Sequence, residues 1–268
     1  MAAAITKEQE TLFSTNLFLY AVCPLLKTIL EDRPALQKGW QSKKAIAQIS
    51  CKTAEGKMAI HYIFENADCT PKKGVSEESP DIELEFKSPE HLCGFFKGKL
   101  FPLPKMKGAI KRFPVFLNFM KLLLTMSGLL GAKTAPKKDC DQKLLVKCMF
   151  YLLSRGISIL NKLGHPDVSA WAAVSPDRIY AWAVEGEPEL AAYLRVKKGK
   201  TKARRGEYTK SMPFFTMKFD SPKSALGILQ ETDDMIEATI QQRLIMVGGP
   251  EFGAQLGDFM LLVGSMVK

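Results

Sequence analysis

The strongest constraint on the fold of this chain is an internal repeat. Asp81–Pro89 and Phe214–Pro222 share one pattern, in which apolar and polar residues alternate, reach Phe, and continue through a charged residue to Ser-Pro. The two phenylalanines, Phe86 and Phe219, are 133 residues apart. A period near half the length of the chain predicts two similar domains of roughly 130 residues rather than an array of short repeats.

The composition agrees with two domains and suggests where they meet. The 268 residues suffice for two ordinary domains, and the 46% of apolar residues can supply a core for each. Residues 131–138 are rich in Gly, Pro and Lys, as linkers are. We therefore predict one domain over residues 1–133, a divergent copy, and a second over residues 140–268. Each should be an α+β fold in which helices cover a mixed, mostly antiparallel sheet.

Alternation of apolar residues predicts the strands. Ile82, Leu84 and Phe86 should form an inward face, which Phe215, Met217 and Phe219 repeat in the second half. Polar residues 66–80 are expected to form a loop, and the basic residues 195–210 to lie in a long connection between strands. The predicted strands cover residues 44–51, 57–65, 81–87 and 105–110 in the first half, and 168–174, 178–184, 189–196, 213–219 and 240–247 in the second.

An apolar helix should close each domain, starting near Pro114 and near Pro250. Each helix has a narrow polar stripe and a broad face rich in Phe and Met, which are adaptable side chains for lining an apolar cavity. The ordinary alternative is that these residues simply fill a core. The candidate cavity-lining residues are Phe116, Phe119, Met120, Leu123 and Leu124 in the first half, and Phe252, Leu256, Phe259, Met260 and Val263 in the second.

The second half also resembles a known family. Residues 219–226 read Phe-Asp-Ser-Pro-Lys-Ser-Ala-Leu, and after a helix and a strand residues 249–260 read Gly-Pro-Glu-Phe-Gly-Ala-Gln-Leu-Gly-Asp-Phe-Met. This order resembles the sterol carrier protein 2 family over about 140–268, and more loosely over about 14–130. The resemblance implies a five-stranded sheet with helices over an apolar tunnel that holds fatty acyl chains or sterols. The tandem arrangement and the absence of a C-terminal Ser-Lys-Leu-like tripeptide depart from the family.

The positive charge of the chain is concentrated in one segment. Arg195–Lys210 carries eight basic residues against Glu207, a net +7 out of +10 for the whole chain. Such a segment is either a solvated hairpin tip or a site for anionic lipid headgroups or an acidic partner. Because Tyr208 is the single aromatic ring nearby, we expect no nucleic-acid partner. The candidate residues for an anionic surface are Lys197, Lys198, Lys200, Lys202, Arg204 and Arg205.

The remaining chemistry-bearing residues form no recognisable site. The three histidines lack metal-ligand spacing, the six cysteines form no CxxC pair, and there is no GxSxG or phosphate-binding loop. We therefore expect no metal, no cofactor and no enzymatic activity. The N-terminus lacks the pattern of a secretory signal, and the cysteine usage suits a reducing compartment, so we expect a cytoplasmic protein.

These observations favour one function and leave two others open. The leading hypothesis is non-enzymatic binding or transport of a lipid or other long apolar ligand, in a cavity between the sheet and the C-terminal helix of each repeat. The alternative is a scaffold with filled cores that docks an acidic partner or an anionic membrane through the basic hairpin of residues 195–210. A third hypothesis is an accessory subunit or transferase that holds its substrate in the cavity.

Overall fold

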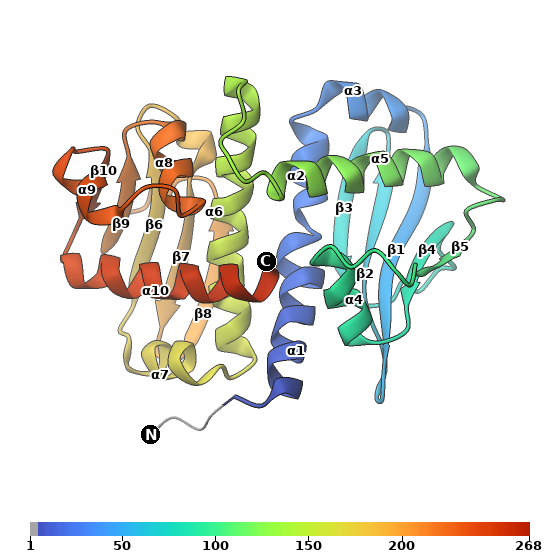
Figure 1. Cartoon of the computed structure of the whole chain (residues 1–268), viewed down its shortest axis with the longest axis horizontal. Coiled ribbons are helices and arrows are strands. Elements are labelled where there is room, and N and C mark those ends of the chain that lie inside the picture. Colours follow the sequence, from blue (N-terminus) through green and yellow to red (C-terminus); the bar gives the residue numbers. More distant parts are fainter. Residues whose placement is uncertain (1–4) are drawn as a thin grey trace. The chain divides into compact units, whose positions relative to one another are not determined.

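The computed structural model describes residues 5–268 and divides into two compact units (Figure 1). The N-terminal unit comprises residues 5–128 with 266–268, and the C-terminal unit comprises residues 129–265. Each unit contains one five-stranded mixed sheet and its helices, which confirms the predicted α+β class. The division falls directly before the predicted linker at residues 131–138.

The N-terminal unit begins with an interrupted helix. Thr6 and Gln9 form a capping box at its start, and Pro24, which lacks a backbone N–H, separates its last part. Its segments are α1 (Lys7–Leu17), a π-helical turn (Phe18–Val22), α2 (Leu25–Glu31), α3 (Pro34–Gln37) and a 3-10 turn (Lys38–Trp40).

The first sheet has the strand order β3-β2-β1-β4-β5, in which β1 and β4 are parallel and the other pairs antiparallel. Ile82, Leu84 and Phe86 on β4 are buried, as their alternation predicts. Ser88 accepts a hydrogen bond from the N–H of His91 and so caps the following helix. The elements are β1 (Lys44–Thr53), β2 (Gly56–Glu65), β3 (Asp68–Lys73), β4 (Ile82–Phe86), α4 (Pro89–Phe96), β5 (Lys105–Lys107) and α5 (Phe113–Leu130).

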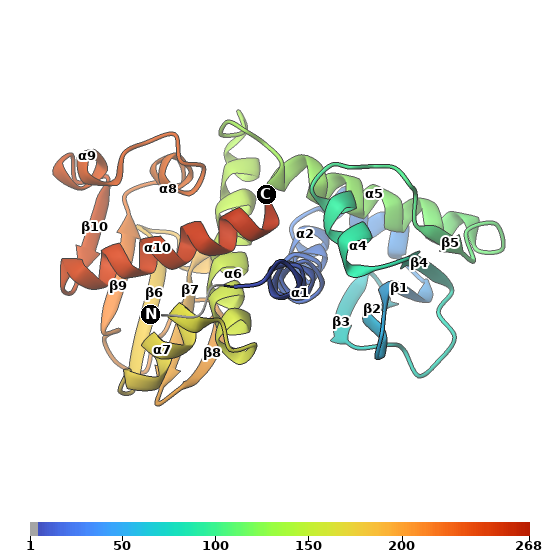
Figure 2. The ribbon, with the colours of Figure 1, turned by 60° about the horizontal axis from the view of Figure 1, so that its bottom comes forward.

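The C-terminal unit has the same sheet topology. Its order β10-β9-β6-β7-β8 places the parallel pair, β6 and β9, where β1 and β4 lie in the first sheet. The helix α6 packs against β7 and β8, and α10 lies across the sheet (Figures 1 and 2). The elements are α6 (Asp139–Lys162), α7 (Pro166–Val174), β6 (Arg178–Val184), a 3-10 turn (Pro188–Leu190), β7 (Ala192–Lys197), β8 (Lys200–Arg205), β9 (Phe215–Phe219), α8 (Pro222–Leu229), α9 (Met235–Ile240), β10 (Leu244–Val247) and α10 (Pro250–Val267).

Three sequence-based predictions of local structure are wrong. Residues 168–174 form helix α7 rather than a strand, because Pro166 starts a helix and the alanines that follow favour one. Residues 66–80, predicted as a loop, contain strand β3, and the basic connection contains strand β8. Both are edge strands, whose charged residues suit an exposed sheet edge but resemble those of a loop.

Three helical stretches are long and apolar enough to cross a membrane, judged by length and composition. They are Lys7–Glu31, Phe113–Leu130 and Asp139–Lys162. The most apolar part of the first stretch is 89% buried inside the protein and that of the third is 72% buried, whereas for α5 the value is 22%. The apolar residues of the first and third stretches are therefore used in packing, and much of α5 remains at the surface.

Candidate functional site

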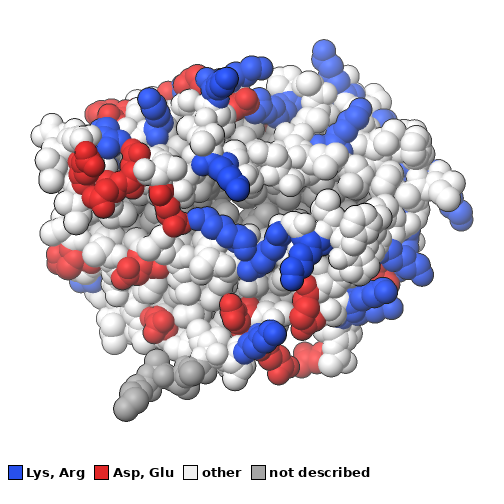
Figure 3. All heavy atoms as spheres, viewed as in Figure 1, with Lys and Arg blue, Asp and Glu red and all other residues white. Residues whose placement is uncertain are grey.

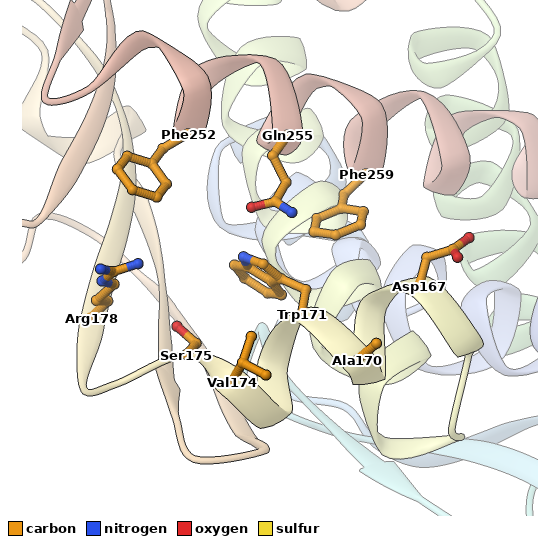
Figure 4. Close-up of a pocket in the computed structure, with 9 residues that line it drawn as sticks. All are labelled: Asp167, Ala170, Trp171, Val174, Ser175, Arg178, Phe252, Gln255 and Phe259. Atoms are coloured by element: carbon orange, nitrogen blue, oxygen red, sulfur yellow. The ribbon is translucent and has the colours of Figure 1, made fainter. Parts of the chain in front are cut away.

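An open pocket of about 660 Å³ lies in the C-terminal unit, between α7 and α10 and beside the start of β6 (Figure 4). Its volume is in the range of small-molecule sites. The lining combines a wide apolar wall with a few polar groups. The residues are Asp167, Ala170, Trp171, Val174, Ser175, Arg178, Phe252, Gln255 and Phe259.

Aromatic rings form the wall of the pocket. Trp171 on α7 meets Phe259 on α10 edge to face, with ring centroids 5.1 Å apart. Trp171 also contacts Tyr180 at 5.3 Å, Tyr180 contacts Phe214 at 5.8 Å, and Phe214 contacts Phe252 at 4.7 Å. Such ring pairs stabilise each other beyond the burial of their area. The wall is therefore a connected aromatic cluster, held by one helix on each side and by the sheet.

Arg178 supplies the positive charge of the pocket. Its guanidinium carbon lies 3.9 Å from the centre of the Phe214 ring and 5.0 Å from that of Phe252, so cation–π contacts hold it in place. Within residues 5–268, no carboxylate forms an ion pair with Arg178. Nearby Asp177 pairs instead with Arg195 and Lys197, and the Arg195 guanidinium holds the pKa of this carboxyl below its usual range. The guanidinium of Arg178 thus keeps its hydrogen-bonding edge available.

Two neutral polar side chains accompany Arg178. Ser175 is 4% exposed, and its hydroxyl forms no hydrogen bond within the described residues. A buried hydroxyl without a partner is costly, so such groups mark places where a ligand can supply the missing hydrogen bond. Gln255 extends from α10 toward Trp171 (Figure 4). The polar groups therefore gather around one side of an otherwise aromatic pocket.

The predicted cavity residues of the second half separate into two groups. Phe252 and Phe259 line the pocket, whereas Leu256, Met260 and Val263 are buried in packing. The Nε1 atom of Trp182 lies 3.3 Å from the sulfur of Met260, which brings α10 directly onto the sheet. This pocket accordingly lies between two helices and beside the start of β6, whereas the predicted cavity lies between the sheet and α10.

The candidate residues of the first half lie on different sides of α5. Phe119 is buried against Tyr62 and Phe64, while Phe116, Met120 and Leu123 are half-buried. Leu124 is 66% exposed. Trp40, which precedes β1, is buried and stacks on Phe64 with ring centroids 3.6 Å apart. In this unit a tryptophan therefore fills the core beneath α5.

The basic residues of 195–210 divide between the two faces of the β7–β8 hairpin. Arg195 lies opposite Lys202, and Lys197 opposite Lys200. We call the exposed set of Arg195, Lys197, Lys200, Lys202 and Arg204 the cationic face. Arg205 points to the other side, where its guanidinium lies over the ring of Tyr151 on α6 at 4.9 Å. Lys198 occupies the turn with a positive φ of 44°.

The first sheet carries a buried charge network on β4. Glu83 accepts hydrogen bonds from Gln48, Ser50, Lys57 and Lys107, and the same two lysines bind Glu85. Burial alone would raise the pKa of Glu83, but the bonds from Lys107, Lys57, Ser50 and Gln48 outweigh it and lower the pKa to about 2. The pKa of Glu85 is also lowered to about 2, chiefly by Lys107. Although Glu83 and Glu85 alternate with the inward residues of β4, both side chains are therefore buried rather than exposed.

The sequence analysis did not identify several residues that line the pocket. It also predicted no metal site. Trp171 was missed because residues 168–174 were assigned to a strand, Ser175 because it directly follows that segment, and Arg178 because it resembles any charged residue at a strand start. Within the described part of the chain, no group of three or more His, Cys, Asp or Glu side chains could hold a metal ion. The helix-start signal at Pro166, five residues before Trp171, was the available clue to this side of the pocket.

Comparison with known proteins yields structural likeness at low identity. No family model and no curated protein matches the chain. The chain is similar to a conserved hypothetical protein of Thermus thermophilus, a possible sterol carrier protein, with 20% identity, 41% of this chain and 83% of that chain covered, and a TM-score of 0.28. It is also similar to the stereoselective inverting sec-alkylsulfatase of a Pseudomonas species, with 15% identity, coverage of 69% and 32%, and a TM-score of 0.26. This chain therefore spans about a third of the alkylsulfatase.

Proposed function

We propose that the C-terminal unit binds a small amphiphilic molecule in the pocket between α7 and α10 and releases it unchanged. The observation that supports this proposal most directly is the aromatic wall with the guanidinium of Arg178 beside it. Trp171, Phe252 and Phe259 suit the apolar body of a lipid-like ligand, because apolar contact area supplies most of the affinity in such sites. The proposed function is that of a lipid carrier, as the sequence suggests, and the proposal assigns the binding to this pocket.

The polar groups favour a ligand with an anionic end. A guanidinium offers paired N–H donors that match a carboxylate, sulfate or phosphate group. Ser175 can add a hydrogen bond to the same end, since its hydroxyl has no partner among residues 5–268. Asp167 lies at the opposite side of the pocket from Arg178 (Figure 4), so it does not neutralise the guanidinium. We therefore expect the anionic end at Arg178 and the apolar chain along Trp171 and Phe259.

The same residues favour ligand binding over catalysis. Nucleophilic catalysis by a serine requires a base within hydrogen-bond distance. Ser175 has no such base in the described chain, and the pocket lining contains no histidine, lysine or cysteine. The pocket thus offers recognition and positioning but no activated nucleophile.

The test compares three probes with one apolar chain and different ends: decanoate, decanol and decylammonium. Calorimetric titration should give saturable binding in the order decanoate, decanol, decylammonium. Arg178→Gln should remove the preference for decanoate, with a loss of about tenfold or more in its affinity. Arg204→Gln, on the cationic face and outside the pocket, is the matched control and should bind like wild type. Absence of saturable binding of all three probes would refute the proposal.

A second candidate function is peripheral attachment to an anionic membrane through the cationic face. Like charges placed directly opposite on neighbouring strands destabilise a sheet, and here Arg195 faces Lys202 while Lys197 faces Lys200. Asp177 partly compensates the β7 residues, whereas Lys200, Lys202 and Arg204 form no ion pair within residues 5–268. A surface that retains this destabilising repulsion between like charges suits an anionic partner. Sedimentation with anionic vesicles should weaken steeply as salt rises, and salt-independent sedimentation would refute this candidate.

A further inference from the structure

A second exposed element, in the N-terminal unit, combines apolar and basic side chains. We call residues 97–105, which run from the end of α4 to the first residue of β5 and precede α5, the α4–α5 loop. Its Leu100, Phe101 and Leu103 are 56%, 80% and 51% exposed. Its three lysines, Lys97, Lys99 and Lys105, are exposed among them. From residue 97 to residue 113 the chain contains no Asp or Glu. Large apolar side chains concentrated at a surface in this way mark an interaction site rather than scattered exposure.

The loop is held in place by hydrogen bonds to the folded unit. The Nε2 atom of His91 lies 2.6 Å from the carbonyl oxygen of Pro102, and the N–H of Lys99 donates to the carbonyl of Gly94 at 2.8 Å. At its far end β5 pairs with β4. The apolar side chains are therefore presented to solvent by a fixed backbone and do not belong to a frayed chain end.

The lysines of the loop are electrostatically available. Within residues 5–268, Lys97, Lys99 and Lys105 form no ion pair, whereas two basic residues that follow are engaged: Lys107 binds Glu83, and Arg112 binds Asp81. The turn after β5 repeats the composition, with Ile110 94% exposed beside Lys111. Figure 3 shows Lys and Arg side chains gathered at the end of the N-terminal unit that carries β5 and the start of α5.

We propose that the α4–α5 loop inserts Leu100, Phe101 and Leu103 into the headgroup region of an anionic lipid bilayer while its lysines bind the lipid phosphates. A lysine side chain can extend its ammonium group to the headgroups while its aliphatic stem and a neighbouring Phe lie deeper. The inference is independent of the pocket, since it rests on another unit and on other residues.

The composition of the loop favours a bilayer over other occupants. The centres of protein–protein interfaces are depleted in lysine, yet here lysines stand between the apolar side chains. A second copy of the chain is disfavoured because each copy carries a net charge of +10. An anionic bilayer satisfies both features of the loop, since it accepts apolar side chains and attracts cations, with a gain of about fivefold in binding for each lysine.

The direct test places a fluorescent reporter in the loop. Phe101→Trp substitutes an exposed aromatic residue, and the three native tryptophans, Trp40, Trp171 and Trp182, are buried. With vesicles of mixed phosphatidylglycerol and phosphatidylcholine, the added fluorescence should shift to the blue and be quenched by brominated lipid chains. Ile240→Trp, at an exposed position of α9, is the matched reporter and should show neither effect. An unshifted signal from the Phe101→Trp variant when it is bound to these vesicles would overturn the proposal.

Charge and partner controls complete the experiment. The triple variant Lys97→Gln, Lys99→Gln, Lys105→Gln should lose about a hundredfold in vesicle partitioning. The variant Lys200→Gln, Lys202→Gln, Arg204→Gln leaves the loop intact, so quenching per bound molecule should be unchanged. Phe101→Ser should lower partitioning while the protein stays folded, since the side chain is exposed. A change in oligomeric state on Phe101→Ser, with vesicle binding intact, would identify a second copy as the occupant and refute the bilayer.

Discussion

Each unit has a tryptophan shortly before the first strand of its sheet, and the two tryptophans lie in different surroundings. In the N-terminal unit Trp40 is 1% exposed and stacks on Phe64 in the core. In the C-terminal unit Trp171, 9% exposed, forms the wall of an open pocket with Phe259. The strand order of the two sheets is the same. The difference shows that the same sheet topology occurs with a filled core in one unit and with an open pocket in the other.

The helical segment before the first strand differs between the two units. In the N-terminal unit α3 and the 3-10 turn that follows are short, and Asn118 on α5 donates a hydrogen bond to the carbonyl of Gly39 at 2.6 Å. This bond joins the turn to α5 above it. In the C-terminal unit α7 is a full helix of nine residues, and between it and α10 lies the pocket. The N-terminal unit thus has a hydrogen bond between the turn and α5, and the C-terminal unit has a pocket between α7 and α10.

The largest effect should come from removing the core tryptophan. Trp40→Ala should lower the free energy of unfolding by about 3–5 kcal/mol, because it leaves a cavity against Phe64. Trp171→Ala should cost about half as much, since that side chain already borders open space, and should abolish decanoate binding. Urea denaturation followed by circular dichroism measures both losses. Equal losses with unchanged binding would show that the two tryptophans have the same role.

The sequence predicted the repeated inward faces because strands bury every second residue. Ile82, Leu84 and Phe86, like Phe215, Met217 and Phe219, lie in the core for that reason. It could not place the pocket, because apolar helix faces look alike whether they pack or bind: Phe259 lines the pocket while Leu256, one turn earlier, is core. Arg178 gave no signal, since its meaning depends on Phe214 and Phe252, which only the fold brings to it. The predicted cytoplasmic location stays a prediction.

The second comparison concerns the outward residues of the equivalent strands β4 and β9, where acid should affect the two units differently. In β4 these are Glu83 and Glu85, with pKa values lowered to about 2; in β9 they are Thr216 and Lys218. Because folding lowers these pKa values, their stabilisation is complete above about pH 4.5 and is lost as the pH falls toward 2. Hydrogen exchange between pH 5 and pH 2 should show the N-terminal unit losing protection first.

Glu83→Gln isolates the charge network. At neutral pH it should lower the free energy of unfolding by about 2 kcal/mol, because hydrogen bonds to a charged group are lost while the shape is kept. It should also flatten the acid dependence of the N-terminal unit. Glu185→Gln, whose partner Lys218 is on β9, is the control and should change stability little, since that pair is exposed. An unchanged acid profile in Glu83→Gln would exclude the network as the cause.

A smaller effect should follow from breaking the contact that joins α5 to the turn before β1. Asn118→Ala removes the hydrogen bond to Gly39 and should cost about 1 kcal/mol in unfolding free energy. If this bond keeps the space beneath α5 closed, adding Asn118→Ala to the Arg178→Gln variant should create an additional weak site for decanol. Thr125→Ala, on the same helix, is the control, since its hydroxyl bonds only within α5. Equal effects of the two variants would show that Asn118 does not close the unit.

The smallest effect should be a gain in stability on the cationic face. Lys202 lies directly opposite Arg195 in the β7–β8 register, so Lys202→Gln removes a like-charge pair and should raise the free energy of unfolding by about 0.2–1 kcal/mol at low salt. The gain should shrink as salt screens the pair. Lys210→Gln, in the loop beyond β8, removes the same charge outside the strand register and should give no gain. Thermal unfolding at two salt concentrations measures the difference. If both variants gained stability equally, net charge rather than cross-strand repulsion would be responsible. The cationic face would then not destabilise the sheet, and this support for an anionic partner would be lost.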